Sequence, residues 1–320
     1  MKRFLLIYVL LFIFLTSACP SNITREKDDV VEKLKDFQGT ETDDKENQEL
    51  QNQIEQIASD AKGRVGVAAT VLETFESVFL NSTEHFPMQS VYKLPIGMAV
   101  MKEVDAGKIK LDQKIRVEKN DFVRIGMRSP IRDKYPKGAE LSVSELLRLM
   151  ISESDGTASD VLMEHIGGAT AVMNYLSELG IAEIIVANTE KEFGQDQTLQ
   201  YKNWASPDGA LHLLRALHER RDGLSEQSQG LLLKFMTESP TGPKRLKGLL
   251  PKGAIVAHKT GTSGTVEGVT AATNDIGIIR LPDGRHLAVA VFVADSPANE
   301  TMREEVIAKI AKAVWDKWSS

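Results

Sequence analysis

The chain has 320 residues, of which 42% are hydrophobic and 26% are charged, and its formal net charge is −6. Such a composition is typical of a globular protein large enough for one big domain or for two lobes that share a core. Because no basic stripe is interleaved with aromatic residues, we expect no nucleic-acid partner. The six histidines are scattered, none lies in a His-Glu-x-x-His pattern, and the chain has one cysteine, so we expect no metal ion and no other cofactor.

Residues 1–18 have the pattern of a secretory signal peptide. A positively charged start precedes an apolar run from Phe4 to Leu15, which is too short to span a membrane comfortably. Cys19 stands where a signal peptidase would cut and resembles the lipidated first residue of a bacterial lipoprotein. The alternative is ordinary secretion with cleavage after Ala18. We expect an exported, periplasmic protein that is tethered to the membrane through a lipid on Cys19.

The segment from Ser21 to about Ile57 is dense in charged and amide side chains and poor in large apolar ones. This composition predicts a solvated tether that runs into the first helix. We therefore expect three parts in chain order. These are the signal peptide over 1–18, a lipid-anchor site with a charged tether over 19–57, and one folded domain over 58–320.

Two strands and a helical region are predicted after the tether. The stretches "RVGVAATVLE" (64–73) and "ESVFLNS" (76–82) favour a β-hairpin. The middle of the chain carries helix start and stop signals. These signals are a capping box from Ser142 to Glu145, Ser206 followed by Pro207, Ser225 as an N-cap, and Gly180 as a helix stop.

Strands return near the end of the chain, over residues 254–262, 269–281 and 286–295, with a Pro-Asp-Gly turn before the last of them. A final amphipathic helix from Arg303 to Trp318 follows. Strands at both ends of a helical middle predict an α+β fold, an α/β sandwich. Its antiparallel sheet is made from both chain ends and backed by the terminal helices, and an all-helical lobe is inserted, with a cleft between sheet and lobe.

The stretch "PMQSVYKLP" places a serine and a lysine three residues apart between two prolines. The prolines favour a helix that begins near Ser90, and on that first turn Ser90 and Lys93 share one face. The pair would give a nucleophile with a possible proton acceptor beside it. Alone, Ser-x-x-Lys occurs so often by chance that it favours a capping serine followed by a solvated lysine.

Three further motifs follow in order: Ser154-Asp155-Gly156, then Glu190 within "TEKEF", then Lys259-Thr260-Gly261. This ordered set resembles that of the class A serine β-lactamases. The similarity runs from about residue 64 to residue 318. The stretches "FPMQSVYKL", "VAHKTGTSG" and "TAATNDIGIIRLPDGR" are especially similar to the PER-type extended-spectrum branch. The resemblance implies the serine β-lactamase and penicillin-binding fold, and hydrolysis of β-lactam antibiotics, penicillins and cephalosporins among them, through a serine acyl-enzyme.

The resemblance also implies a role for each motif in the reaction. Ser90 would attack the lactam, with either Lys93 or a water held by Glu190 as the base, and the sequence leaves that choice open. Ser154 would hand a proton to the departing nitrogen, and Glu190 would activate the water that frees the acyl-enzyme. Singly, Ser154 also fits a helix-end cap, and Glu190 also fits a surface acid.

A second group of residues would bind the substrate. The backbone N–H groups of Ser90 and Thr262 would face the developing oxyanion. Lys259, Thr260 and Thr262, on the strand that also carries Gly261, would bind the substrate carboxylate. Taken alone, Thr260 also fits a simple β-strand preference.

The chain departs from the family pattern at several positions. Gly156 stands in place of an asparagine that contacts the acyl side chain, and Gly194 in place of one that helps hold the hydrolytic water. The ion pair that often pins the loop around the glutamate is replaced by Asn188 and Asn203, which predicts a differently folded or more open loop. Arg245 is expected to add positive charge near the carboxylate site.

Three other classes of protein are alternatives to this interpretation. A penicillin-binding D,D-peptidase shares the serine, lysine and Lys-Thr-Gly elements but has no deacylating acid equivalent to Glu190. A non-hydrolytic β-lactam sensor is usually fused to a membrane-spanning relay. A general esterase would have a Gly-x-Ser-x-Gly elbow, which is absent around Ser90. We expect a monomeric enzyme.

Overall fold

The computed structural model describes residues 41–319. The signal peptide, Cys19 and most of the expected tether lie outside these residues. Helix α2 covers Glu41–Ser59, and the compact unit that holds the fold begins at Asn47 rather than at residue 58. The reason is that Leu50 and Ile54, four residues apart on one face of α2, are buried in the core. Among residues 41–319, no helix combines the length and apolar character that crossing a membrane requires.

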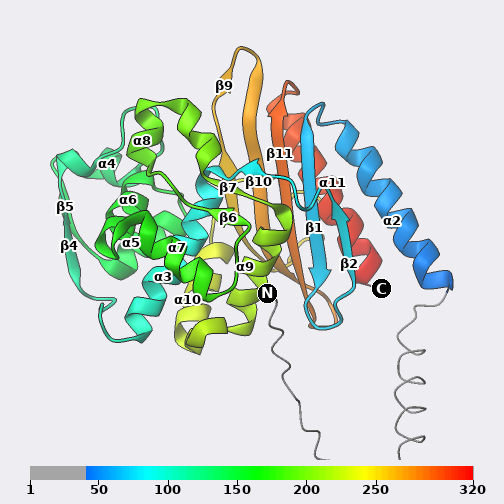
Figure 1. The fold of residues 1–320 in the computed structure, drawn as a ribbon, viewed down its shortest axis with the longest axis horizontal. Helices are drawn as coiled ribbons and strands as arrows, with labels where there is room; N and C mark the ends of the chain where they lie inside the picture. Colours follow the sequence, from blue (N-terminus) through cyan, green and yellow to red (C-terminus); the bar gives the residue numbers. More distant parts are fainter. Residues whose placement is uncertain (1–40, 320) are drawn as a thin grey trace, which may run out of the picture. The chain divides into compact units, whose positions relative to one another are not determined.

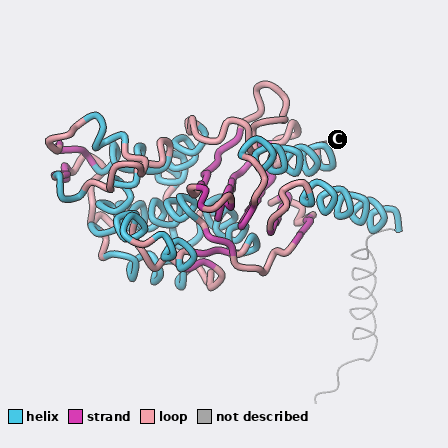
Figure 2. Tube along the Cα trace, turned by 90° about the horizontal axis from the view of Figure 1, so that it is seen from above, coloured by secondary structure: helices cyan, strands magenta, loops and turns pink. Residues whose placement is uncertain are grey.

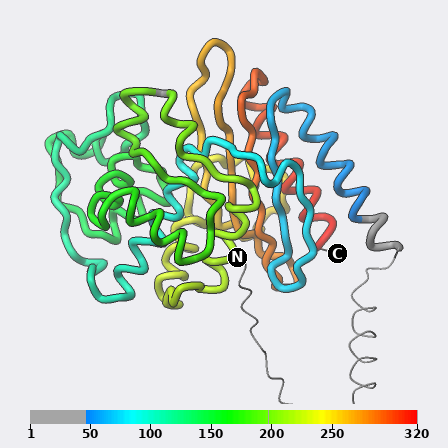
Figure 3. The backbone as a smooth tube through the Cα atoms, in the orientation of Figure 1, coloured from blue at the N-terminus to red at the C-terminus, as the bar shows by residue number. Residues whose placement is uncertain are grey.

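The two ends of the folded unit form one antiparallel sheet (Figure 1). Strand β1 pairs with β11 from Arg64 opposite Ala294 to Val71 opposite Leu287, so both chain ends contribute to one sheet as predicted. Figure 3 shows the N-terminal strands beside the C-terminal ones. The strand order is β2-β1-β11-β10-β8, with β9 paired to β10. The bounds are β1 Arg64–Val71, β2 Ser77–Leu80, β8 Val256–Thr262, β9 Thr265–Val266, β10 Val269–Arg280 and β11 His286–Ser296.

Each face of the sheet is buried in a separate hydrophobic core. On β11, Val289 and Val291 pack with α2 and with the terminal helix α11 (Glu300–Trp318). Ala290 and Phe292, which alternate with them, belong to the core of the helical lobe. Because successive side chains of a strand point to opposite faces of the sheet, the almost continuous apolar run of β11 contributes side chains to both cores. Figure 2 shows the two long helices along one side of the strands.

The inserted lobe is mainly helical, and its helix starts follow the sequence signals. The capping box of Ser142 and Glu145 is formed, and the Ser206 and Ser225 side chains cap the next helices. The helices are α3 Lys93–Asp105, α4 Pro130–Lys134, α5 Val143–Ile151, α6 Gly156–His165, α7 Gly168–Glu178, α8 Glu190–Gln195, α9 Pro207–Glu219 and α10 Glu226–Thr237. Short 3-10 turns are η1 Gln89–Tyr92, η2 Lys119–Asp121, η3 Gln197–Lys202 and η4 Arg221–Gly223. Short strands are β3 Phe86–Pro87, β4 Lys114–Val117, β5 Ala139–Ser142, β6 Ile184–Ile185 and β7 Trp204–Ala205.

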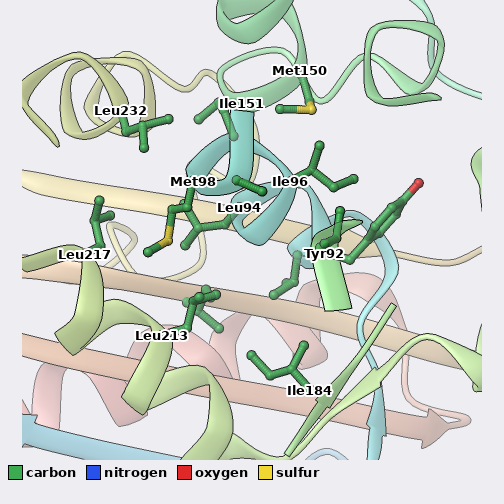
Figure 4. Packing of buried hydrophobic residues seen from close by; sticks show 14 of the residues in the cluster. Tyr92, Leu94, Ile96, Met98, Met150, Ile151, Ile184, Leu213, Leu217 and Leu232 are labelled. Carbon is green, nitrogen blue, oxygen red and sulfur yellow. The ribbon is translucent and has the colours of Figure 1, made fainter. Parts of the chain in front are cut away.

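Helix α3 is the buried centre of this lobe. Its side chains Leu94 and Met98 lie among Ile151, Leu217 and Leu232 of three neighbouring helices (Figure 4). Because every residue from Lys93 to Met101 is buried, the first turn of α3 is held firmly between the lobe and the sheet. That turn carries the Ser-x-x-Lys motif.

Candidate active site

Ser90 and Lys93 lie on the turn between β3 and α3. The sequence predicted a helix that begins near Ser90. Ser90 is in the 3-10 turn η1, and the α-helix itself begins at Lys93. In a 3-10 turn, side chains three residues apart eclipse one another. The Lys93 Nζ accordingly donates a hydrogen bond to Ser90 Oγ at 2.8 Å, and Lys93 is fully buried.

Glu190 is the first residue of α8 and reaches the same lysine. Its Oε1 forms a hydrogen-bonded ion pair with Lys93 Nζ. The backbone N–H groups of Glu190 and Lys191 donate to the carboxylate of Asp160 on α6, at 2.8 and 2.9 Å. Burial, together with the charge of Glu190, raises the pKa of Asp160 to about 7. Asp160 therefore fixes the start of α8 and the position of Glu190.

Sequence reasoning did not single out Asp160. Its only local signal is an acidic residue in the buried part of a helix, four positions beyond Gly156. Nothing in the sequence indicates that the start of α8 docks against it.

Ser154 and Lys259 form a second pair across the cleft. The Lys259 Nζ donates to Ser154 Oγ at 3.0 Å and to the carbonyl of Thr260 at 3.1 Å. Ser154 has φ +58, a left-handed conformation that turns the chain just before α6. Burial, with the nearby charge of Lys93, lowers the pKa of Lys259 well below its usual value. Two buried lysines thus each contact a serine hydroxyl.

The strand β8 carries hydroxyl groups that are held by neighbouring segments. Arg245 is buried, and its Nη2 donates to Thr262 Oγ1 at 2.8 Å. The positive charge of Arg245, which was expected near the carboxylate site, therefore lies next to Thr262. The Thr260 and Thr241 hydroxyls lie 2.7 Å apart, a partner for Thr260 that the sequence did not indicate.

Gly261 lies where strand β8 packs against η1. A Cβ at this position would clash with the carbonyl oxygen of Met88. Glycine is therefore required for the two backbones to approach so closely. The approach brings Thr262 and Ser90 to the wall of one cleft.

Gly156 and Gly194 leave different amounts of room. At Gly156, a Cβ would lie 3.2 Å from Cγ of Glu190 and 3.3 Å from the carbonyl oxygen of Arg128, so a larger residue would press on Glu190. At Gly194, a Cβ would lie 3.1 Å from Sδ of Met127. That sulfur belongs to a flexible side chain, which can move more easily than backbone.

The loop that carries Glu190 is closed by the amide of Asn203. Its Oδ1 accepts from the N–H groups of Ala187 and Asn188, both at 2.8 Å, and its Nδ2 donates to the Asn188 carbonyl at 2.9 Å. A single buried amide therefore ties both ends of the loop with no ion pair between positions 188 and 203.

These residues surround a cleft of about 840 Å³ between the sheet and the helical lobe. Among the residues on its wall are Ser90, Ser154, Glu190, Thr260 and Thr262. Lys93 and Lys259 are fully buried and contact the cleft through the hydroxyls of Ser90 and Ser154. The arrangement offers hydroxyl nucleophiles, paired amines and one carboxylate to a molecule in the cleft.

Comparison with known proteins identifies the family. Residues 49–318 match the sequence model of the β-lactamase enzyme family. The chain belongs to this family. The β-lactamase is 46% identical to the extended-spectrum β-lactamase PER-1 of Pseudomonas aeruginosa over 268 residues, which covers 83% of this chain and 86% of that protein.

Solved structures agree with this assignment. A β-lactamase from Chitinophaga pinensis is 45% identical, with a TM-score of 0.82 over 84% of this chain and 98% of that one. A class A β-lactamase from Bacteroides cellulosilyticus is 36% identical, with a TM-score of 0.78 over 84% of this chain and 98% of that one. The protein is a class A β-lactamase of the predicted α+β fold, an enzyme that hydrolyses β-lactam antibiotics and so gives resistance to them.

Proposed function

We propose that this β-lactamase opens the lactam ring by attack of Ser90 and releases the product with the help of Glu190. The observation that carries the proposal is the position of Lys93, whose Nζ contacts both Ser90 Oγ at 2.8 Å and the carboxylate of Glu190. A serine hydroxyl is a weak nucleophile until a base removes its proton. The three groups form a continuous path for that proton.

Two routes for the proton fit this geometry in the acylation step. Lys93 can take it directly if its amine is neutral when substrate is bound. Glu190 can take it through a water, because its carboxylate shares the cleft with Ser90. On either route the developing oxyanion would accept hydrogen bonds from the backbone N–H groups of Ser90 and Thr262. The close contact of Gly261 with η1 supports the idea that these two N–H groups point to the same place.

Ser154 is proposed to protonate the departing lactam nitrogen. Its hydroxyl faces the cleft and accepts a hydrogen bond from Lys259. As Ser154 gives its proton to the nitrogen, Lys259 can donate a proton to the Ser154 oxygen. The amine therefore supports the step without contacting the lactam ring.

The substrate carboxylate is proposed to bind beside strand β8. Lys259, Thr260 and Thr262 supply an ammonium and two hydroxyls, and Arg245 adds a guanidinium that already contacts Thr262. Burial disfavours the charged form of Lys259 in the free enzyme, but an arriving carboxylate favours it again. Recognition of the anion and protonation of Lys259 are therefore coupled.

Deacylation is proposed to depend on Glu190 as the base for the attacking water. Gly194 provides no side-chain amide to hold that water, so Glu190 and Ser90 carry more of its positioning. Gly156 likewise offers no amide to the acyl side chain, and it allows Glu190 to pack closely against α6.

The test of the nucleophile is Ser90→Ala, with Ser263→Ala as the matched control. Ser263 lines the same cleft but contacts only backbone groups of Gly264 and Ala272. Mass spectrometry after exposure to a penicillin should show a covalent adduct in the wild type and in Ser263→Ala, and none in Ser90→Ala. An adduct on Ser90→Ala would disprove the assignment.

The substrate range is proposed to include penicillins and cephalosporins, with the extended spectrum that the name of the PER-1 relative states for that enzyme. The closure of the loop by the Asn203 amide is the feature of this chain that supports a cleft different from one pinned by an ion pair. Steady-state kinetics with a penicillin, a third-generation cephalosporin and a carbapenem would test it. Failure to hydrolyse the third-generation cephalosporin would contradict it.

Export to the periplasm and lipidation of Cys19 are also proposed, on the apolar run before the chain's single cysteine. The intervening tether would let the catalytic domain work at a distance from the anchor. Cys19→Ser should move the enzyme from the membrane fraction to the soluble periplasmic fraction with unchanged turnover. Equal solubility of wild type and variant would contradict lipidation. We propose that the enzyme acts as a monomer, which light scattering would check.

A further inference from the structure

Two histidines and a glutamate meet at the end of the sheet away from the cleft wall at Thr262. Glu73 follows β1 in the turn to β2, His218 is in the last turn of α9, and His286 begins β11. Figure 1 shows the β1–β2 turn at the lower edge of the sheet and the β9 hairpin at its upper edge. Three segments that are far apart in the sequence therefore supply one side chain each.

The atoms that could bind a metal lie close together. Glu73 Oε1 is 2.7 Å from His286 Nδ1 and 3.9 Å from His218 Nε2. One nitrogen or oxygen from each residue lies within 4.8 Å of the others. In a tetrahedral zinc site with bonds of ~2.0–2.2 Å, ligand atoms are separated by roughly 3.3 Å. Small rotations of these side chains would bring the three atoms to that separation.

The backbone already holds the carboxylate and one ring in place. The His286 N–H donates to Glu73 Oε2 at 2.9 Å, and the Leu72 N–H donates to the His286 carbonyl at 2.8 Å. The rings of His218 and His286 pack with their centroids 4.5 Å apart. Glu73 and His286 are therefore positioned by the pairing of β1 with β11, which reduces the side-chain freedom that they lose on binding, whereas His218 reaches them from α9 by packing on the His286 ring.

We propose that Glu73, His218 and His286 bind one divalent transition-metal ion, with Zn²⁺ as the expected occupant. Imidazole and carboxylate ligands suit Zn²⁺, whereas Ca²⁺ and Mg²⁺ prefer oxygen ligands alone. The side chains are 25–39% exposed, so water can supply the fourth ligand. If His286 binds through Nδ1, the proton that this nitrogen shares with Glu73 leaves to solvent as the metal–nitrogen bond forms.

The bound ion would link the β1–β2 turn, α9 and β11 without touching the catalytic residues. Thr262 pairs with Thr273 on β10, which pairs with Val293 on β11. Val293 is ~23 Å along the strand from His286, at ~3.3 Å per residue. We therefore expect the metal to raise thermal stability and to leave β-lactam hydrolysis unchanged.

The experiment uses tag-free protein in a Cys19→Ser background, so that no tag and no thiol binds metal. After treatment with a chelator, Zn²⁺ titration calorimetry should give one site with a micromolar or lower Kd. His218→Ala and His286→Gln should each weaken binding by at least ~10–100-fold. His212→Gln is the matched control, because His212 is exposed on the same helix as His218 and lies outside the cluster.

Glu73→Gln tests the site with a minimal change, since the amide oxygen can still accept the His286 N–H while the charge is lost. Zn²⁺ should raise the melting temperature of the wild type and of His212→Gln but not that of Glu73→Gln. Hydrolysis of a chromogenic cephalosporin at the wild-type rate would verify the fold of each variant. The proposal is wrong if the wild type binds Zn²⁺ more weakly than ~1 mM, or if the three cluster variants bind as tightly as His212→Gln.

Discussion

Asn203 is the side chain whose removal should disturb the loop around Glu190 most directly. Its buried amide satisfies the N–H groups of Ala187 and Asn188 and the Asn188 carbonyl. In Asn203→Ala these three groups lose their partner, and each buried group left unpaired costs about 1–3 kcal/mol. Because Ala187 is exposed, water can reach part of the vacated space. We therefore expect the free energy of unfolding to fall by about 2–4 kcal/mol.

Urea unfolding followed by circular dichroism would measure this loss. A chain of this size loses roughly 2–4 °C of melting temperature per kcal/mol, so the expected fall is roughly 4–16 °C. The loosened loop should also misplace Glu190, and stopped-flow measurements should show deacylation slowed more than acylation. Asn52→Ala, at an exposed position on α2, is the control and should change neither quantity.

A second variant separates the two functions of the amide. Asn203→Asp keeps an oxygen for the N–H groups of Ala187 and Asn188 but loses the donor to the Asn188 carbonyl, so its stability should lie between those of the wild type and Asn203→Ala. If Asn203→Ala unfolds within about 0.5 kcal/mol of the wild type and deacylates at the same rate, the amide does not close the loop as the geometry indicates.

The remaining predictions concern groups in and around the cleft. Glu190→Ala should still form the acyl-enzyme but should stall there, with turnover reduced by ~10²–10⁴-fold. A steady-state rate equal to that of the wild type would contradict the role of Glu190 in deacylation. Its control is Glu192→Gln. Glu192 forms a capping box with Thr189, and the glutamine side chain keeps a hydrogen-bond acceptor at that position. Because the pKa of Lys259 is lowered, its charge is lost as pH rises through that value. KM for a carboxylate-bearing penicillin should then rise by up to ~tenfold per pH unit, whereas Lys259→Arg, which stays charged, should show no such rise. Gly194→Asn should speed deacylation of carbapenems if the Met127 side chain moves aside, and an unchanged or slower rate in single-turnover assays would show that it does not.

Much of the fold could be predicted from the sequence because its signals are local. The continuous apolar run over 287–294, the caps at Ser142, Ser206 and Ser225, and the stop at Gly180 each depend on residues that are close together in the chain. The catalytic motifs and their order can also be recognised in the sequence, because each motif consists of residues that are close together in the chain. The local patterns predict an α+β fold, and the resemblance of the motif set to the class A family predicts a β-lactamase.

The arrangement of the site depended on contacts between distant segments, which local patterns do not encode. Lys93 meets Glu190, and Asp160 holds the start of α8, only because α3, α6 and α8 pack together. The start of the compact unit at Asn47 likewise depends on a core that covers α2. Spacing alone predicted no metal site, because histidines and a glutamate on three separate segments have no motif. Local sequence patterns specify the helices, the strands and the reactive groups that they carry, whereas the packing of those elements brings particular side chains face to face.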